Sequence, residues 1–250
     1  MEALIYILII TYGLVIGSFL NVLILRIPEK EDFVKERSHC MKCGYQLAWY
    51  DMVPVFSYAC LKGKCRKCGE PISIQYPIVE ALNALLYFLI FFVNGNNYYS
   101  VMYCFVTSAL IVISFIDFRT YEIPFGLTVF IGVMGIVCTA MDYHQIPLHI
   151  IGMCSVGLVL EILFIVSSGN WIGGGDATLM MAAGLVLGWK KIVAAFFIAC
   201  ILGAVIHSIR MKVSHADHVL ALGPYLAMGI YLMMVWGDIF INWYLGLLGL

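Results

Sequence analysis

Long apolar segments recur from one end of the chain to the other, and they constrain the fold more than any other feature. An α-helix rises about 1.5 Å per residue, so a hydrocarbon core of about 30 Å requires roughly 20 apolar residues. Hydrophobic residues make up 63% of the chain and charged residues only 12%, whereas a typical soluble domain has about 25% charged residues. The sequence therefore predicts an all-α polytopic membrane protein.

The apolar pattern predicts about eight transmembrane helices and an amphipathic or interfacial tail at 238–250. The first helix is expected to be retained, because Glu2 stands where a signal peptide carries basic residues. Gly17, Ser18 and Asn21 are expected to form a helix-packing surface on it. The segment 177–188 is the weakest prediction, because it is too short to cross about 30 Å alone. The expected spans are 4–25, 78–93, 101–116, 123–141, 146–166, 177–188, 192–209 and 219–236.

The positions of Lys and Arg orient these helices, because short cytoplasmic loops carry the excess of positive charge. Of the 14 basic residues, nine lie between Arg26 and Lys67, where they alternate with acidic residues and indicate no nucleic-acid surface. An outside N-terminus places these nine in the cytoplasm with Arg119, Arg210 and Lys212, and leaves Lys190 and Lys191 outside. If 177–188 is instead a re-entrant segment, Lys190 and Lys191 move inside and Arg210 and Lys212 move outside, so as many basic residues are cytoplasmic as before. The charges therefore do not decide whether 177–188 spans the membrane.

One polar segment, 28–77, is expected to form a small cytoplasmic domain between a first transmembrane helix at 1–27 and a transmembrane peptidase domain at 78–250. It contains two C-x-x-C pairs, each followed by a glycine, and four thiolates satisfy a tetrahedral structural zinc site. Two disulfides are the alternative, but they require an oxidising compartment. Cys60 is expected to be a buried apolar thiol. The four predicted zinc ligands are Cys40, Cys43, Cys65 and Cys68.

Asp176 stands at the entrance to an apolar run, directly behind Gly173, Gly174 and Gly175. An acid at the centre of a membrane helix costs roughly 2.5 to 3.5 kcal/mol, so it is a functional candidate. Asp117, at the end of the third predicted span, faces the same side of the membrane in the eight-helix arrangement. Two neighbouring carboxylates share one proton and can together activate a water and polarise a carbonyl. We predict a catalytic pair of Asp117 and Asp176, supported by Gly173 and Gly175, with the roles of acid and base left open.

Other polar residues are weaker candidates. His207, His215, Asp217 and His218 are explained by a polar turn between spans better than by a metal site. Glu161 is expected to pack against a polar neighbour inside the membrane. Arg119 and Glu122, beside Asp117, form a loop pair or tune the aspartates, and the sequence leaves these two possibilities open.

Several motifs together resemble the type IV prepilin leader peptidases, which are GxGD aspartic membrane proteases. The resemblance extends over nearly the whole chain. It is carried by Gly17–Val22 with Arg26 and Pro28, the four cysteines, Asp117 followed by Ile123-Pro124, the Gly173, Gly175 and Asp176 signature, and Leu222-Gly223-Pro224-Tyr225.

The resemblance implies two reactions in the bacterial inner membrane. The first cleaves the short basic leader of a prepilin or pseudopilin at the cytoplasmic face, and the second methylates the new N-terminal amine with S-adenosyl-L-methionine. It also implies a structural Zn²⁺. It names no residues for the methyl donor, beyond pointing to the cytoplasmic segment with Asn21, Arg26 and Glu80 at its edges.

Two alternatives remain at this stage. One is a presenilin-like or archaeal preflagellin-type protease without methyltransferase activity, against which the cysteine-bearing segment argues. The other is a zinc-bearing scaffold or transporter in which the two aspartates are acids of an ion path. Methyl transfer to a cleaved substrate separates the first alternative from the bifunctional enzyme, and cleavage itself excludes the second.

Overall fold

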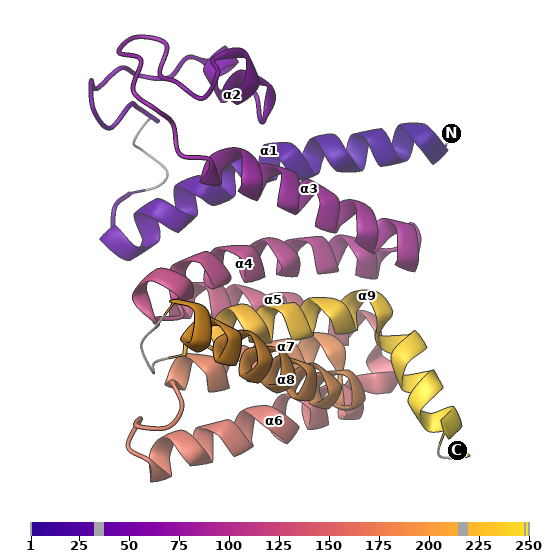
Figure 1. The fold of residues 1–250 in the computed structure, drawn as a ribbon. Coiled ribbons are helices and arrows are strands. Elements are labelled where there is room, and N and C mark those ends of the chain that lie inside the picture. Colours follow the sequence, from indigo (N-terminus) through magenta and orange to yellow (C-terminus); the bar gives the residue numbers. More distant parts are fainter. Residues whose placement is uncertain (1, 33–37, 215–219, 248, 250) are drawn as a thin grey trace. The chain divides into compact units, whose positions relative to one another are not determined.

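The computed structural model describes residues 2–32, 38–214, 220–247 and 249, and these are helical apart from turns, loops and two isolated β-bridges (Figure 1). The prediction of an all-α fold is confirmed. The α-helices are α1 (Glu2–Glu29), α2 (Phe56–Cys60), α3 (Gln75–Asn94), α4 (Tyr98–Thr120), α5 (Phe125–Met141), α6 (Ile146–Val166), α7 (Gly174–Leu187), α8 (Trp189–Ser214) and α9 (Gly223–Leu247), with short 3₁₀ turns at Trp49–Met52 and Tyr143–Gln145.

Six of these helices are long and apolar enough to cross a membrane: α1, α3, α4, α6, α8 and α9. The protein is therefore a multi-pass membrane protein, as predicted. α5 and α7 are apolar but have only 17 and 14 residues. By length and composition they are not assigned as spans, so the predicted number of eight is not decided by these criteria.

The last helix differs from its prediction at both ends. α9 begins at Gly223 rather than near 219, and Pro224 occupies its first turn, where the missing N–H of proline costs no helical hydrogen bond. At its other end, α9 continues through Asp238 to Leu247 rather than ending near Trp236, and the amphipathic or interfacial character of 238–250 stays a prediction. The carboxylate of Asp238 accepts a hydrogen bond from Lys191 of α8 at 2.9 Å, so its charge does not end the helix.

The chain divides into two compact units, Met1–Phe92 and Val93–Leu250. In the first unit, α1 and α3 lie against each other through small residues (Figure 1). A Cβ atom on Gly13 would lie 2.6 Å from the Cα of Ala84. Asn83 donates a hydrogen bond to the carbonyl of Gly13 at 2.7 Å, and Asn21 donates one to Tyr76 at 3.2 Å. Close approach and interhelical hydrogen bonds hold this pair.

The second unit is built around α7, which lies between α5, α6 and α8 (Figure 1). Most of its side chains are buried. Glycines on its neighbours allow the close approach: a Cβ on Gly135 of α5 would lie 2.6 Å from Leu185, and one on Gly157 of α6 would lie 2.2 Å from Met181. α7 therefore packs against protein along its length, which accounts for a helix of only about 21 Å.

Candidate active site and metal centre

Asp117 lies in the last turn of α4 and is buried, with 4% of its surface exposed. Its Oδ2 accepts a hydrogen bond from the backbone N–H of Gly223 at 2.9 Å. Gly223 is the first residue of α9, and the partial positive charge of a helix N-terminus stabilises a nearby carboxylate. A Cβ atom on Gly223 would lie 2.7 Å from the same oxygen, so a glycine is required for this approach.

Asp176 is the third residue of α7 and is half-buried. Its carboxylate lies beside Gly173, the N-cap residue of the helix, where an added Cβ would lie 3.1 Å from Asp176 Oδ2. Like Asp117, Asp176 therefore lies at the positive end of a helix.

The two aspartates come from segments that pack together. Gly175 lies against Ile123 in the loop that follows α4, where an added Cβ would approach the Cβ of Ile123 to 2.8 Å. Asp176 also lies within range of an electrostatic interaction with Asp117. The segments that carry the two acids therefore contact each other, while the pairing of the two carboxylates and their part in catalysis stay predictions.

Gly223 and Ile123 are contacts that were not predicted as site residues. The only sequence signal for them was their position in motifs of the resemblance, Leu222-Gly223-Pro224 and Ile123-Pro124. Arg210 of α8 was not singled out either, and its guanidinium lies 5.0 Å from the ring centre of Phe118, the neighbour of Asp117.

The weaker candidates do not add a second centre among the described residues. His215, Asp217 and His218 lie outside the described residues. His207 lies in α8, and the only potential metal-binding cluster in the described part of the chain consists of cysteines. Glu122 is exposed in the loop after α4, and the choice between a loop pair with Arg119 and tuning of the aspartates stays open.

The four predicted zinc ligands come together in the first unit. The sulfurs of Cys40, Cys43, Cys65 and Cys68 all lie within 4.8 Å of one another, and those of Cys40 and Cys68 are 3.8 Å apart. A tetrahedral site with Zn–S bonds of about 2.3 Å has edges of about 3.8 Å. All four are free thiols, so the pairs are not joined as disulfides.

Two equivalent turns position these sulfurs. In each turn, the backbone carbonyl of the first cysteine accepts a hydrogen bond from the N–H of the glycine that follows the C-x-x-C pair. The N–H of the same cysteine donates to the carbonyl of the residue after that glycine. The glycines have φ angles of +66° and +73°, a left-handed conformation that favours glycine. The bonds are Gly44 N–H to Cys40 O (2.9 Å), Cys40 N–H to Tyr45 O (2.9 Å), Gly69 N–H to Cys65 O (2.9 Å) and Cys65 N–H to Glu70 O (2.8 Å).

The donor set fits a metal such as zinc. Backbone N–H groups of Cys43 and Lys42 lower the pKa of the Cys40 thiol to about 6. A thiolate is the form that binds metal. Four sulfurs at tetrahedral separations leave no open position, which is the arrangement of a structural rather than a catalytic zinc site.

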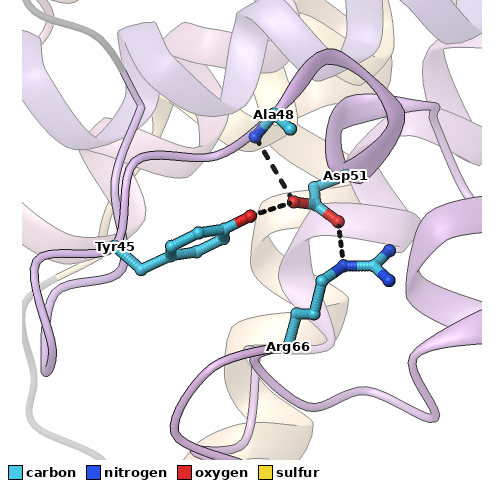
Figure 2. Close-up of polar contacts among 4 residues, drawn as sticks. All are labelled: Tyr45, Ala48, Asp51 and Arg66. Carbon is cyan, nitrogen blue, oxygen red and sulfur yellow. Dashed lines mark hydrogen bonds and ion pairs between the residues drawn. The ribbon is translucent and has the colours of Figure 1, made fainter.

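A buried acid links the two turns (Figure 2). Asp51 accepts hydrogen bonds from Arg66 Nε at 2.8 Å, from the Tyr45 hydroxyl at 3.3 Å and from the Ala48 N–H at 3.3 Å. Tyr45 follows the first cysteine pair and Arg66 lies within the second. The acid and its donors therefore hold the two cysteine turns in register.

Cys60 is exposed rather than buried, so that prediction is wrong. It ends the one-turn helix α2, and the segment around it is too small to bury both sides of that helix. Between residues 38 and 74 only Asp51 and Cys65 are buried. This segment therefore has almost no apolar core of its own.

Comparison with known proteins identifies the family. Residues 104–208 match the model of the type IV leader peptidase family, and residues 11–94 match the bacterial peptidase A24 N-terminal domain. A relative from Xanthomonas campestris pv. campestris, named prepilin leader peptidase/N-methyltransferase, is 31% identical over 95% of this chain and 93% of its own length. The chain belongs to the type IV leader peptidase family.

Other members of the family carry the same name. The relative from Myxococcus xanthus is 35% identical over 199 residues, which cover 78% of this chain but 59% of the relative. One from Aeromonas salmonicida is 28% identical over 95% of this chain and 93% of its own length. No solved structure gave a significant match. Asp117, Asp176 and the glycines before Asp176 all fall within the region that matches the leader peptidase model.

Proposed function

We propose that this protein cleaves the leader peptide of type IV prepilin-like substrates with Asp117 and Asp176, and then methylates the new N-terminal amine. The observation that carries the proposal is the convergence of the two acids: Asp117 receives the first N–H of α9, and the segment of Asp176 packs on the loop after α4. Membership of the family and the name shared by its relatives support both reactions.

The proposed cleavage needs no covalent intermediate. One carboxylate accepts a proton from a water molecule as its oxygen attacks the scissile carbonyl, and the other carboxyl group donates a proton to the carbonyl oxygen. The carboxyl group that took the water proton passes it to the leaving nitrogen, and the other carboxylate takes a proton back from the tetrahedral diol. The C–N bond then breaks and releases the new amine, with both acids in their starting protonation states. The N-termini of α7 and α9 stabilise the negative charge of the pair throughout. Asp176 is the more exposed of the two acids.

We further propose that α1 and α3–α9, including the short α5 and α7, all cross the inner membrane and that the two acids face the cytoplasm. α7 runs antiparallel to α6: Gly174 at its start lies near Phe164, close to the end of α6, and Gly184 near its end lies near Gly152, in the first half of α6. α8 then returns, because Lys191 lies beside Asp238 of α9 whereas Arg210 lies beside Phe118. This path supports a buried crossing by α7 and leaves Lys190 and Lys191 on the outer side, as the eight-helix arrangement requires.

The cysteine centre is proposed to hold a structural Zn²⁺ through Cys40, Cys43, Cys65 and Cys68. Its role is to order the cytoplasmic segment, because a structural zinc site supplies folding free energy directly. S-adenosyl-L-methionine supplies the methyl group when it is bound. The contacts of the described residues do not identify its binding site. We include this methyl donor because the proposed second reaction requires one.

Co-expression with a type IV prepilin, followed by mass spectrometry of the substrate, tests the proposal. The wild type should remove the leader and add one methyl group. Asp117→Asn and Asp176→Asn should each slow cleavage by roughly 10³-fold or more, because each variant lacks one proton-transfer group. Asp238→Asn, the same change at an exposed acid of α9 that pairs with Lys191, is the matched control. Unchanged cleavage in both aspartate variants would exclude the pair.

A further inference from the structure

The first unit contains two buried acids among its described side chains, Asp51 and Glu80. The charge of Asp51 is balanced, because Arg66 forms an ion pair with it, and the acid accepts two further hydrogen bonds. Glu80 is 6% exposed, yet none of the ion pairs between described residues involves it. A buried carboxylate without a cation is costly and marks a candidate site.

Glu80 connects three separate segments, namely its own helix α3, the segment of Val55 and helix α1. It lies in the second turn of α3, and its Oε2 accepts a hydrogen bond from the Val55 N–H at 2.8 Å. The hydroxyl of Ser18 on α1 also hydrogen bonds to its carboxylate. Gly17 brings α1 close, since a Cβ there would lie 2.7 Å from the Cα of Glu80. Both donors are neutral, and a carboxylate offers about four lone-pair positions, so capacity remains for a cationic donor.

The backbone that supplies the Val55 N–H is strained. Val55 has φ +61° and ψ −46°, and Phe56 N–H bonds to Pro54 O at 2.6 Å across it. This is a three-residue γ-turn of the rare kind, in a β-branched residue for which positive φ is a true outlier. Strain of this kind persists where surrounding structure enforces it, and it concentrates at functional sites. Here it directs one N–H at the buried carboxylate.

We propose that Glu80, with Ser18 and Val55 as its neutral donors, binds the α-ammonium group of the cleaved substrate. This inference rests on the proposed function, in which cleavage creates a primary amine that is then methylated. The ammonium supplies the single positive charge and the hydrogen-bond donors that the site lacks. It must also lose a proton before its nitrogen can act as a nucleophile, and the carboxylate that holds it accepts that proton.

Substitution of Glu80 separates charge from shape. Glu80→Gln keeps the size and a carbonyl acceptor for the Val55 N–H but removes the charge, whereas Glu80→Asp keeps the charge and shortens the side chain. If Glu80 binds the ammonium, Gln should lower methylation of a leader-free pilin by roughly 100-fold and Asp should retain more activity than Gln. A purely structural role predicts the opposite order, because Gln is the closer match in shape.

The full-length protein in detergent, with leader-bearing and leader-free pilin, gives the required measurements: leader cleavage, methyl incorporation with its KM and kcat, and bound zinc. Glu29→Gln, the same change at the exposed end of α1, should match the wild type. Glu80→Gln should keep cleavage and zinc and lose methylation, with a raised KM for the leader-free substrate. Wild-type methylation in Glu80→Gln, or a loss that parallels loss of zinc, would overturn the ammonium site. A wild type that cleaves but never methylates would overturn the proposed second reaction and this inference with it.

Discussion

The two polar centres of this protein are stabilised in opposite ways. The cysteine segment at 38–74 buries only Asp51 and Cys65, so its order must depend on polar contacts and, in our proposal, on a metal held by the four sulfurs. The aspartate site lies where the buried helices α4, α7 and α9 meet, and its geometry comes from close backbone approach at glycines. The cysteine centre should therefore fail when its metal is removed, whereas the aspartate site should fail when a glycine that packs against it is replaced by alanine.

Metal removal should have the largest effect, and it should stop at the cysteine segment. Structural zinc contributes binding free energies of about 10 to 16 kcal/mol in zinc-finger peptides, and that energy is folding energy. We expect a chelator, or Cys40→Ser, to release zinc and expose residues 38–74 to limited proteolysis while α4–α9 remain protected. Cys60→Ser, which changes an exposed thiol outside the cluster, is the control. Equal proteolysis of both regions would show that the two centres are not independently stabilised.

Replacing Gly223 with alanine should damage the aspartate site and leave the cysteine centre intact. The added Cβ would lie 2.7 Å from Asp117 Oδ2 and 3.0 Å from Cγ, so the carboxylate must move. A displacement of about 1 Å can cost roughly 100-fold in rate. Gly223→Ala should therefore lower leader cleavage by about that factor without loss of zinc. Gly246→Ala is the matched control on the same helix, because an added Cβ there meets no atom within 4 Å. Equal cleavage by the two variants would contradict the packing at Asp117.

The same contrast explains how far the sequence alone could go. The cysteine centre was predictable, because two C-x-x-C pairs with following glycines specify ligands and turns within a few residues. Pairing Asp117 with Asp176 was also possible, since each stands at the end of an apolar run on one predicted face. The Gly223 contact was not predictable from spacing, because it joins helices that are far apart in sequence. The short α7 was ambiguous because length rules assume lipid around a helix, whereas α7 packs against protein.

The strained turn at Val55 also has no sequence signal. Valine is a residue type that avoids positive φ, so nothing in the sequence predicts this conformation. It depends on Glu80 from α3 and on the fold of the cysteine segment together. Long-range contacts that impose a locally unfavourable conformation are the class of feature that a reading of local patterns misses.

The smallest expected effect concerns the polar contacts that supplement the metal. Asp51→Asn should lower the free energy of unfolding of the zinc-loaded segment by about 1 to 3 kcal/mol, because it leaves buried hydrogen-bond donors imperfectly paired. Glu70→Gln makes the same chemical change in the exposed pair with Lys42, where side-chain exposures are 39% and 66%, and it should cost at most about 1 kcal/mol. Proteolysis of the full-length, zinc-loaded protein across a urea series measures both. If the two variants are equally stable, the metal alone orders the segment. If Asp51→Asn is the less stable variant, the buried Asp51–Arg66 ion pair supplies part of the stability that an apolar core would otherwise provide.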